Sequence, residues 1–175
     1  MREWTDWGRL LREALDQERL LCGSQAGHWP EVRAVHLRSQ HRSIPLVVGL
    51  NALFVLLTAG VFRDAAGWPF LCAWVVLNGL WCLHVLRAWA RLRRRDYQRA
   101  RPWAMRRAQM GTAALSLLWS AAVLAWFGHA DEVGRNFMVT VVVGAMCVGS
   151  LGLSALASAA WCYLLPLTLA TAATL

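Results

Sequence analysis

The sequence contains no lysine and few acids, and charged residues make up only 16% of its 175 positions. Soluble domains carry about 25% charged residues, so the low charge content argues against an ordinary water-soluble domain. All eighteen basic residues are arginine, and we interpret the missing lysine as genomic composition bias. Hydrophobic residues reach 58% and the mean hydropathy is +0.40. The composition therefore predicts an all-α membrane protein.

The sequence also lacks the short motifs of common enzymes. It has no GxSxG nucleophile motif, no HExxH zinc motif, no phosphate-binding loop and no pair of acids within an apolar run. We therefore expect no catalytic residues and no enzyme activity. None of the five cysteines belongs to a CxxC pair, which argues against a disulfide framework or a zinc site, and we expect no metal and no cofactor. The cysteines are Cys22, Cys72, Cys82, Cys147 and Cys162.

No cleavable signal peptide is visible, because the first twenty residues mix acids with bases and have no apolar core. Residues 3–21 instead show the spacing of an amphipathic helix, with Trp4, Trp7 and Leu11 on one face. Such a helix can lie on the membrane surface or pack against a partner or a second copy. Its near-zero net charge slightly favours packing. We assign residues 1–43 to a cytoplasmic helical segment, whose second helix begins at Pro30.

Five apolar runs follow, each of a length suited to crossing the hydrocarbon core. Pro45 stands near the start of the first run, where a first helical turn tolerates proline. We therefore assign residues 44–175 to a transmembrane bundle of five helices, with a sixth possible in the full protein. The predicted spans are residues 44–62, 68–86, 111–127, 136–153 and 161–175.

Arginines determine the predicted orientation. The stretch 87–107 holds nine of them and residues 1–43 hold seven, whereas only Arg63 and Arg135 belong to the opposite side. Arginine-rich short loops stay on the cytoplasmic side of a membrane. We therefore expect a multi-pass protein of the bacterial inner (cytoplasmic) membrane, with a cytoplasmic N-terminus and the lipid bilayer as its first partner. Because the arginines flank apolar runs, we do not expect nucleic-acid binding.

Polar and aromatic residues within the spans are the candidate functional residues. Asn51 and Asn78 are expected to bond between helices, since unpaired polar groups are costly in lipid. Trp74, Trp81, Trp119 and Trp126 lie deep in their spans. They either pack in the core or line, with the two asparagines, an apolar ligand pocket.

Two further patterns have mainly structural interpretations. Cys82, His84, Met146 and Cys147 invite a soft-metal or haem site, but Cys82 and His84 are two apart and point to different helix faces. Small residues around Gly144 and Gly149 recur at helical spacing, which favours close helix packing.

Several segments together resemble a known family. These are RSQHRSIPLVVGLNALFVLLTAGVF, WARLRRRDYQRARP, LSLLWSAAVLAWF and the proline-containing WCYLLPLTLA. Their order resembles the MASE-like membrane sensor regions that precede GGDEF, EAL or histidine-kinase output domains in bacteria. The resemblance implies a sensor or input module that works as a homodimer or with a fused or partner cytoplasmic output domain. No GGDEF, EAL or kinase domain is present in this sequence, and no functional residues transfer.

Two other functions remain open on the sequence. A non-catalytic structural or assembly subunit would use the same spans to pack with a partner membrane protein. A transporter half is disfavoured, because no span carries a charged residue near its middle.

The arginine distribution makes a direct prediction about sidedness. In a variant without native cysteines, Gly67→Cys should react with a membrane-impermeant maleimide in intact cells. Tyr97→Cys should react only after the cells are permeabilised, because the loop that contains it is expected in the cytoplasm. The reverse labelling pattern would contradict the predicted orientation.

Overall fold

The computed structural model describes residues 29–64, 67–93, 102–152 and 157–174, and the predicted helix over residues 3–21 lies outside them. Within the described residues all regular structure is helical, which confirms the predicted all-α class. The elements are α2 (Trp29–Val61), α3 (Trp68–Arg93), α4 (Pro102–Trp126), the short 3-10 helix η1 (Phe127–His129), α5 (Glu132–Gly152) and α6 (Ala157–Thr174).

Four of these helices contain a segment that is long and apolar enough to cross a membrane. They overlap the first four predicted spans. The second and third predicted spans lie wholly within their candidate segments, whereas the first helix ends one residue before the predicted boundary at residue 62 and the fourth candidate span ends at Ser150, before the predicted boundary at residue 153. The predicted fifth span falls on α6, which has 18 residues and is not among the four. The four candidate spans are Arg42–Val61, Trp68–Arg91, Arg106–His129 and Glu132–Ser150.

Local sequence explains where the helices begin. Pro69 lies in the first turn of α3 and Pro102 opens α4, positions where the missing proline N–H costs no helical hydrogen bond. The carbonyl of Gly67 accepts hydrogen bonds from the N–H groups of Phe70 and Leu71 at 3.0 and 3.2 Å. At the start of α5 the carboxylate of Asp131 accepts a bond from the Gly134 N–H at 2.8 Å, which is an N-terminal cap.

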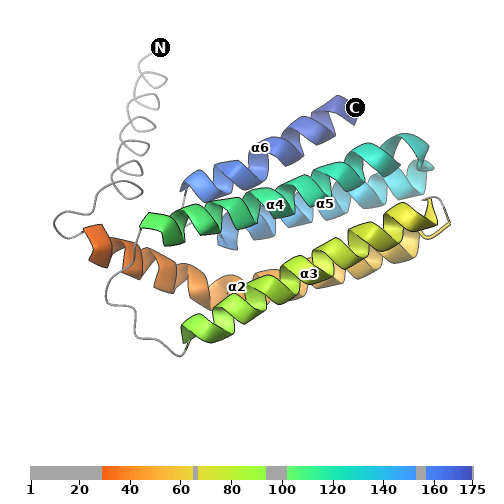
Figure 1. Cartoon of the computed structure of the whole chain (residues 1–175). Coiled ribbons are helices and arrows are strands. Elements are labelled where there is room, and N and C mark those ends of the chain that lie inside the picture. Colours follow the sequence, from red (N-terminus) through yellow and green to blue (C-terminus); the bar gives the residue numbers. More distant parts are fainter. Residues whose placement is uncertain (1–28, 65–66, 94–101, 153–156, 175) are drawn as a thin grey trace, which may run out of the picture.

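Pro45 does not occupy a first turn, contrary to the sequence expectation, because it lies inside the continuous helix α2. The segment before residue 44 and the first predicted span therefore form one helix. Proline cannot donate to the carbonyl four residues earlier, and its ring displaces that carbonyl, so helices bend at such positions. Figure 1 shows α2 changing direction between its first part and its longer second part.

The helices form two groups (Figure 1). Helices α2 and α3 run antiparallel and form a hairpin, and α4, α5 and α6 lie together on one side of it. Helix α5 packs against both α2 and α6, whereas α4 packs most extensively against α6. The indoles of Trp74 and Trp81 on α3 bond to main-chain carbonyls of α4 and join these two helices.

Helices α4 and α6 run in the same direction (Figure 1) and are joined by side-chain hydroxyl groups. Thr112 donates to the carbonyl of Ala159 at 3.4 Å. One turn further along both helices, Ser116 donates to the carbonyl of Tyr163. Small side chains allow helices to approach until such bonds form.

Two glycines on α5 receive aromatic rings from neighbouring helices. The ring of Tyr163 on α6 lies directly against Gly149, and its hydroxyl donates to the carbonyl of Ala145 at 3.2 Å. Gly144 faces the ring of Phe54 on α2, where an added Cβ would lie 3.2 Å from the ring. The glycines expected to permit close packing therefore do so.

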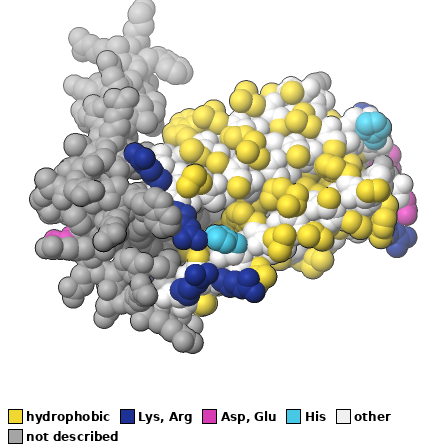
Figure 2. Space-filling view, viewed as in Figure 1, with side chains coloured by type: hydrophobic (Ala, Val, Ile, Leu, Met, Phe, Trp, Pro, Cys, Tyr) yellow, Lys and Arg dark blue, Asp and Glu magenta, His cyan; other side chains and the backbone are white. Residues whose placement is uncertain are grey.

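The surface of the bundle separates apolar from charged side chains (Figure 2). Apolar side chains cover the middle of the visible face, and the coloured arginine, acidic and histidine side chains gather at its two ends. Large side chains such as Leu56, Val76 and Leu117 are 58–67% exposed. An apolar belt between charged ends is the surface expected of a membrane protein.

The contact between Gly149 and Tyr163 predicts a stability effect. Gly149→Ala should lower the free energy of unfolding by about 1–3 kcal/mol, because the added methyl group overlaps the tyrosine ring. The measurement is thermal unfolding of the purified protein in detergent, followed by circular dichroism. Gly79→Ala is the matched control, since no atom lies within 4 Å of its new methyl group. Equal unfolding temperatures for the two variants would contradict the packing.

Candidate functional site

Asn51 connects three helices in the interior of the bundle. It lies on a buried stripe at spacings of three and four residues that comprises Val48, Asn51, Val55 and Thr58 of α2 and continues to Phe62, directly after the helix. Its side-chain oxygen accepts a hydrogen bond from the Trp119 indole on α4 at 2.9 Å. Its amide nitrogen lies 3.5 Å from the Cys82 sulfur on α3, a weak acceptor.

Two further indoles bridge α3 and α4. Trp74 donates to the carbonyl of Leu118 at 2.8 Å, and Trp81 donates to the carbonyl of Gly111 at 2.9 Å. Buried tryptophan normally finds a partner for its N–H group, and here both partners are main-chain carbonyls of the facing helix. The bonds therefore attach α3 to α4 at two positions along their length.

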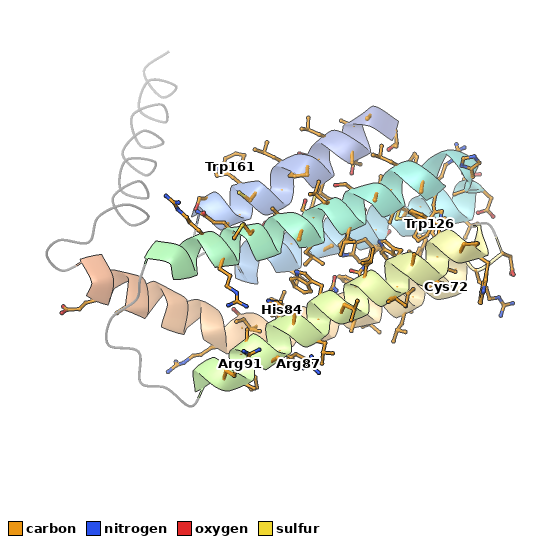
Figure 3. The ribbon with its side chains drawn as sticks, in the orientation of Figure 1. Cys72, His84, Arg87, Arg91, Trp126 and Trp161 are labelled. Carbon is orange, nitrogen blue, oxygen red and sulfur yellow. The ribbon has the colours of Figure 1, made fainter. Side chains whose placement is uncertain are left out.

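The rings of this region stack on one another. Trp74 meets Trp119 and Trp126 edge to face, at centroid distances of 5.2 and 5.1 Å. Trp126 also stacks on Phe62, directly after α2, at a centroid distance of 5.5 Å. Edge-to-face pairs add about 0.5–1.5 kcal/mol each beyond their buried area, so the cluster is a substantial part of the core. Figure 3 shows Trp126 directed into the space between α4 and α3.

Three buried polar atoms on α2, α3 and α4 make no hydrogen bond: Thr58 Oγ1, Asn78 Oδ1 and Ser120 Oγ. Thr58 and Asn78 are at most 1% exposed. An unpaired buried polar group costs about 1–3 kcal/mol. We call these buried and half-buried polar and indole groups of α2, α3 and α4 the polar seam. It consists of Asn51, Thr58, Trp74, Asn78, Trp81, Trp119 and Ser120.

All six candidate residues from the sequence lie at this seam or directly beside it. Asn51, Trp74 and Trp119 contact one another in a chain, Trp126 packs against Trp74, and Trp81 lies further along α3. Asn51 bonds between helices, as expected. Asn78 does not, because its amide donates to the Trp74 carbonyl within α3 at 3.0 Å. Whether these residues bind an apolar ligand stays a prediction.

Thr58 and Ser120 were not among the sequence candidates. Thr58 follows Asn51 by seven residues and so shares its helix face, which is a usable signal once Asn51 is known to point inward. Ser120 follows Ser116 by four residues, on the face of α4 that meets α6. Small hydroxyl residues are common in apolar helices, so composition alone does not distinguish these two.

The set Cys82, His84, Met146 and Cys147 is not brought together. Cys82 faces Asn51 in the interior, whereas His84 is exposed and bonds with Arg107 of α4 at 3.1 Å. Within the described ranges no three His, Cys, Asp or Glu side chains form a group suited to a metal ion. Cys82 and His84 therefore lie on different faces of α3, as their spacing of two residues indicates.

The chain matches no known family model, no curated protein and no solved structure. The class is therefore defined by the structure itself. This is an all-helical bundle, over the residues described, with four helices able to span a membrane.

The bond between Trp119 and Asn51 can be measured with a double-mutant cycle. Trp119→Phe keeps a ring in place but removes the donor, and Asn51→Leu removes the acceptor. We expect a coupling energy of about 0.6–1.7 kcal/mol, the range of hydrogen bonds between membrane helices. The measurement is equilibrium unfolding in mixed micelles.

Trp161→Phe is the control for this cycle, because Trp161 is 49% exposed on α6 and points away from the bundle in Figure 3. Combined with Asn51→Leu it should show additive effects. A coupling energy of zero for the Trp119 pair would contradict the bond.

Proposed function

We propose that this chain is a membrane-embedded sensor or input module of a bacterial signal-transduction protein, of the cyclic-di-GMP or two-component type. In this proposal five helices cross the inner membrane, with a sixth possible in the full protein, and the N-terminus is cytoplasmic. The output domain is fused to the chain or carried by a partner, and the active form is a homodimer or such a complex. The protein itself performs no catalysis.

The observation that carries this proposal is the polar seam with its unpaired atoms. A sensor requires two arrangements of similar free energy that a stimulus can rebalance. Thr58 Oγ1, Asn78 Oδ1 and Ser120 Oγ lack hydrogen-bond partners. This packing is therefore less stable than one in which those atoms were paired. A second packing of α2 and α3 against α4 in which Thr58 and Asn78 pair would lie close in free energy. The seam is therefore the element that we expect to move.

The chemistry of the bonds across the seam fits a small movement. Trp74 and Trp81 donate to main-chain carbonyls of α4, and a helix presents such carbonyls at every turn. An indole that slides by one turn finds an equivalent acceptor. The seam thus permits two registers with little loss of hydrogen bonding.

Removing the unpaired groups should stabilise one arrangement. Thr58→Val and Asn78→Leu should each raise the free energy of unfolding by about 1 kcal/mol, because an apolar group replaces an unsatisfied one. In cells that carry the full-length protein, the same variants should change the basal output about fivefold, as a 1 kcal/mol shift between two states implies. Output is measured as cyclic di-GMP concentration or as kinase phosphorylation, at matched protein levels.

The matched control is Thr168→Val. Thr168 is exposed on α6 and its hydroxyl bonds with carbonyls of its own helix. This variant should change neither stability nor output appreciably. If Thr58→Val and Asn78→Leu raise stability but leave output unchanged, the seam is not a signalling element and the sensor proposal fails.

A structural or assembly subunit is the alternative, and the outward faces of α2 and α3 favour it. These faces carry large exposed apolar side chains that lipid or a partner helix would cover, including Leu46, Leu56, Val76 and Leu80. For such a subunit, the seam variants would leave output unchanged. The protein would then co-purify with one other membrane protein in a fixed ratio.

A further inference from the structure

One face of α3 changes from apolar to basic along its length. Leu77, Leu80, His84, Arg87 and Arg91 are all exposed and recur at spacings of three and four residues, so they line one side of the helix. The two leucines are 50% and 56% exposed. The face therefore runs from hydrocarbon-like surface to positive charge within a few turns.

Helix α4 carries a matching face. Arg107, Met110, Ala114 and Leu117 are exposed at the same spacing, and again the arginine lies at one end of an apolar stripe. An Arg107 Nη2 donor lies 3.1 Å from His84 Nε2, which places the two stripes side by side at their basic ends. Just inside, Trp81 bonds to the Gly111 carbonyl and fixes the same antiparallel register.

The basic ends collect several positive charges on one side of the molecule. Figure 3 shows His84, Arg87 and Arg91 together toward the C-terminal end of α3, and Figure 2 shows a histidine among arginine side chains where the apolar surface ends. Arg91 Nε donates to the Arg87 carbonyl at 3.3 Å, which folds Arg91 back along α3 toward the apolar surface.

Most of the described acidic residues lie away from the basic ends of α3 and α4. Asp64, Asp131 and Glu132 lie in or directly after the turns at the opposite end of the bundle, and Glu31 lies in the first turn of α2. Arg87, Arg91 and Arg107 therefore gather positive charge at the border of the apolar belt.

We propose that this surface binds the headgroup of an anionic phospholipid. The guanidinium groups of Arg87, Arg91 and Arg107 hold the lipid phosphate, since arginine presents paired donors suited to phosphate oxygens. The acyl chains lie along the two apolar stripes, against Leu77, Leu80, Met110 and Leu117. Basic groups at the interface next to transmembrane helices recognise anionic lipids in this way.

The apolar stripes decide in favour of a lipid over a soluble phosphate compound. A soluble anion would use only the arginines and would leave the adjoining exposed leucines without a role. A phospholipid matches both parts at the observed spacing along the helix. The proposal concerns binding alone and does not depend on a signalling role.

The experiment uses the full chain in nanodiscs or mild detergent, titrated with phosphatidylglycerol in a phosphatidylcholine background. Bound lipid is counted by native mass spectrometry. Arg87→Gln/Arg91→Gln should weaken phosphatidylglycerol binding by at least tenfold, because each interfacial arginine contributes about a fivefold factor. Arg107→Gln alone should weaken it by about fivefold.

The matched control is Arg63→Gln/Arg135→Gln, which removes the same charge at the opposite end of the bundle, where both residues are exposed. It should leave the affinity within about twofold of the unchanged protein. Arg87→Lys/Arg91→Lys, which keeps the charge, should recover most of the binding lost with glutamine. Inorganic phosphate should not displace the lipid at millimolar concentration.

Three results would overturn the proposal. The first is equal loss in the two double glutamine variants, which would indicate a general charge effect. The second is unchanged binding in Arg87→Gln/Arg91→Gln when circular dichroism shows an intact fold. The third is displacement of the lipid by inorganic phosphate, which would indicate a free-anion site.

Discussion

Four helices of this structure are apolar enough to cross a membrane, and a hydrocarbon environment would constrain every polar group in them. In a hydrocarbon environment each main-chain N–H and C=O must be paired within the protein, and helices achieve this within a single segment. Polar side chains face the same requirement, and most of them here meet it with carbonyls of their own or a facing helix. Ser116, Trp74 and Trp81 all bond to main-chain oxygen atoms of another helix. The tertiary packing is thus set largely by where a side chain can find a carbonyl.

Two kinds of helix contact follow from this constraint. Between α4 and α6, and between α5 and α6, small residues let backbones approach, so that Ser116 and Tyr163 reach across directly. Between α3 and α4, indole rings fill a wider separation and meet edge to face. The first kind is close and specific, whereas the second relies on large flat groups and a few long-reaching donors. The polar seam lies where the second kind predominates, which is why we place the mobile element there.

Much of the fold could be predicted from the sequence, because apolar runs and proline positions are local signals. The all-helical class and the first four spans follow from them. The continuity of α2 through Pro45 could not be predicted. A proline in a first turn and a proline inside a helix look the same in sequence when the preceding residues also favour helix. The hydrogen-bond partner of Asn51 could not be predicted from the sequence either. Trp119 lies 68 residues from Asn51, and several other tryptophans lie equally deep in their spans.

The bend of α2 gives the molecule mechanical leverage. The part of α2 before Pro45, residues 29–44, extends about 24 Å at 1.5 Å per residue. It leaves the axis of the bundle at an angle (Figure 1). A change of only about 6° at its base would carry the far tip roughly 2.5 Å sideways over that length. A small change of angle at Pro45 would thus produce a larger displacement at the start of α2, without a change in the packing between the spanning helices.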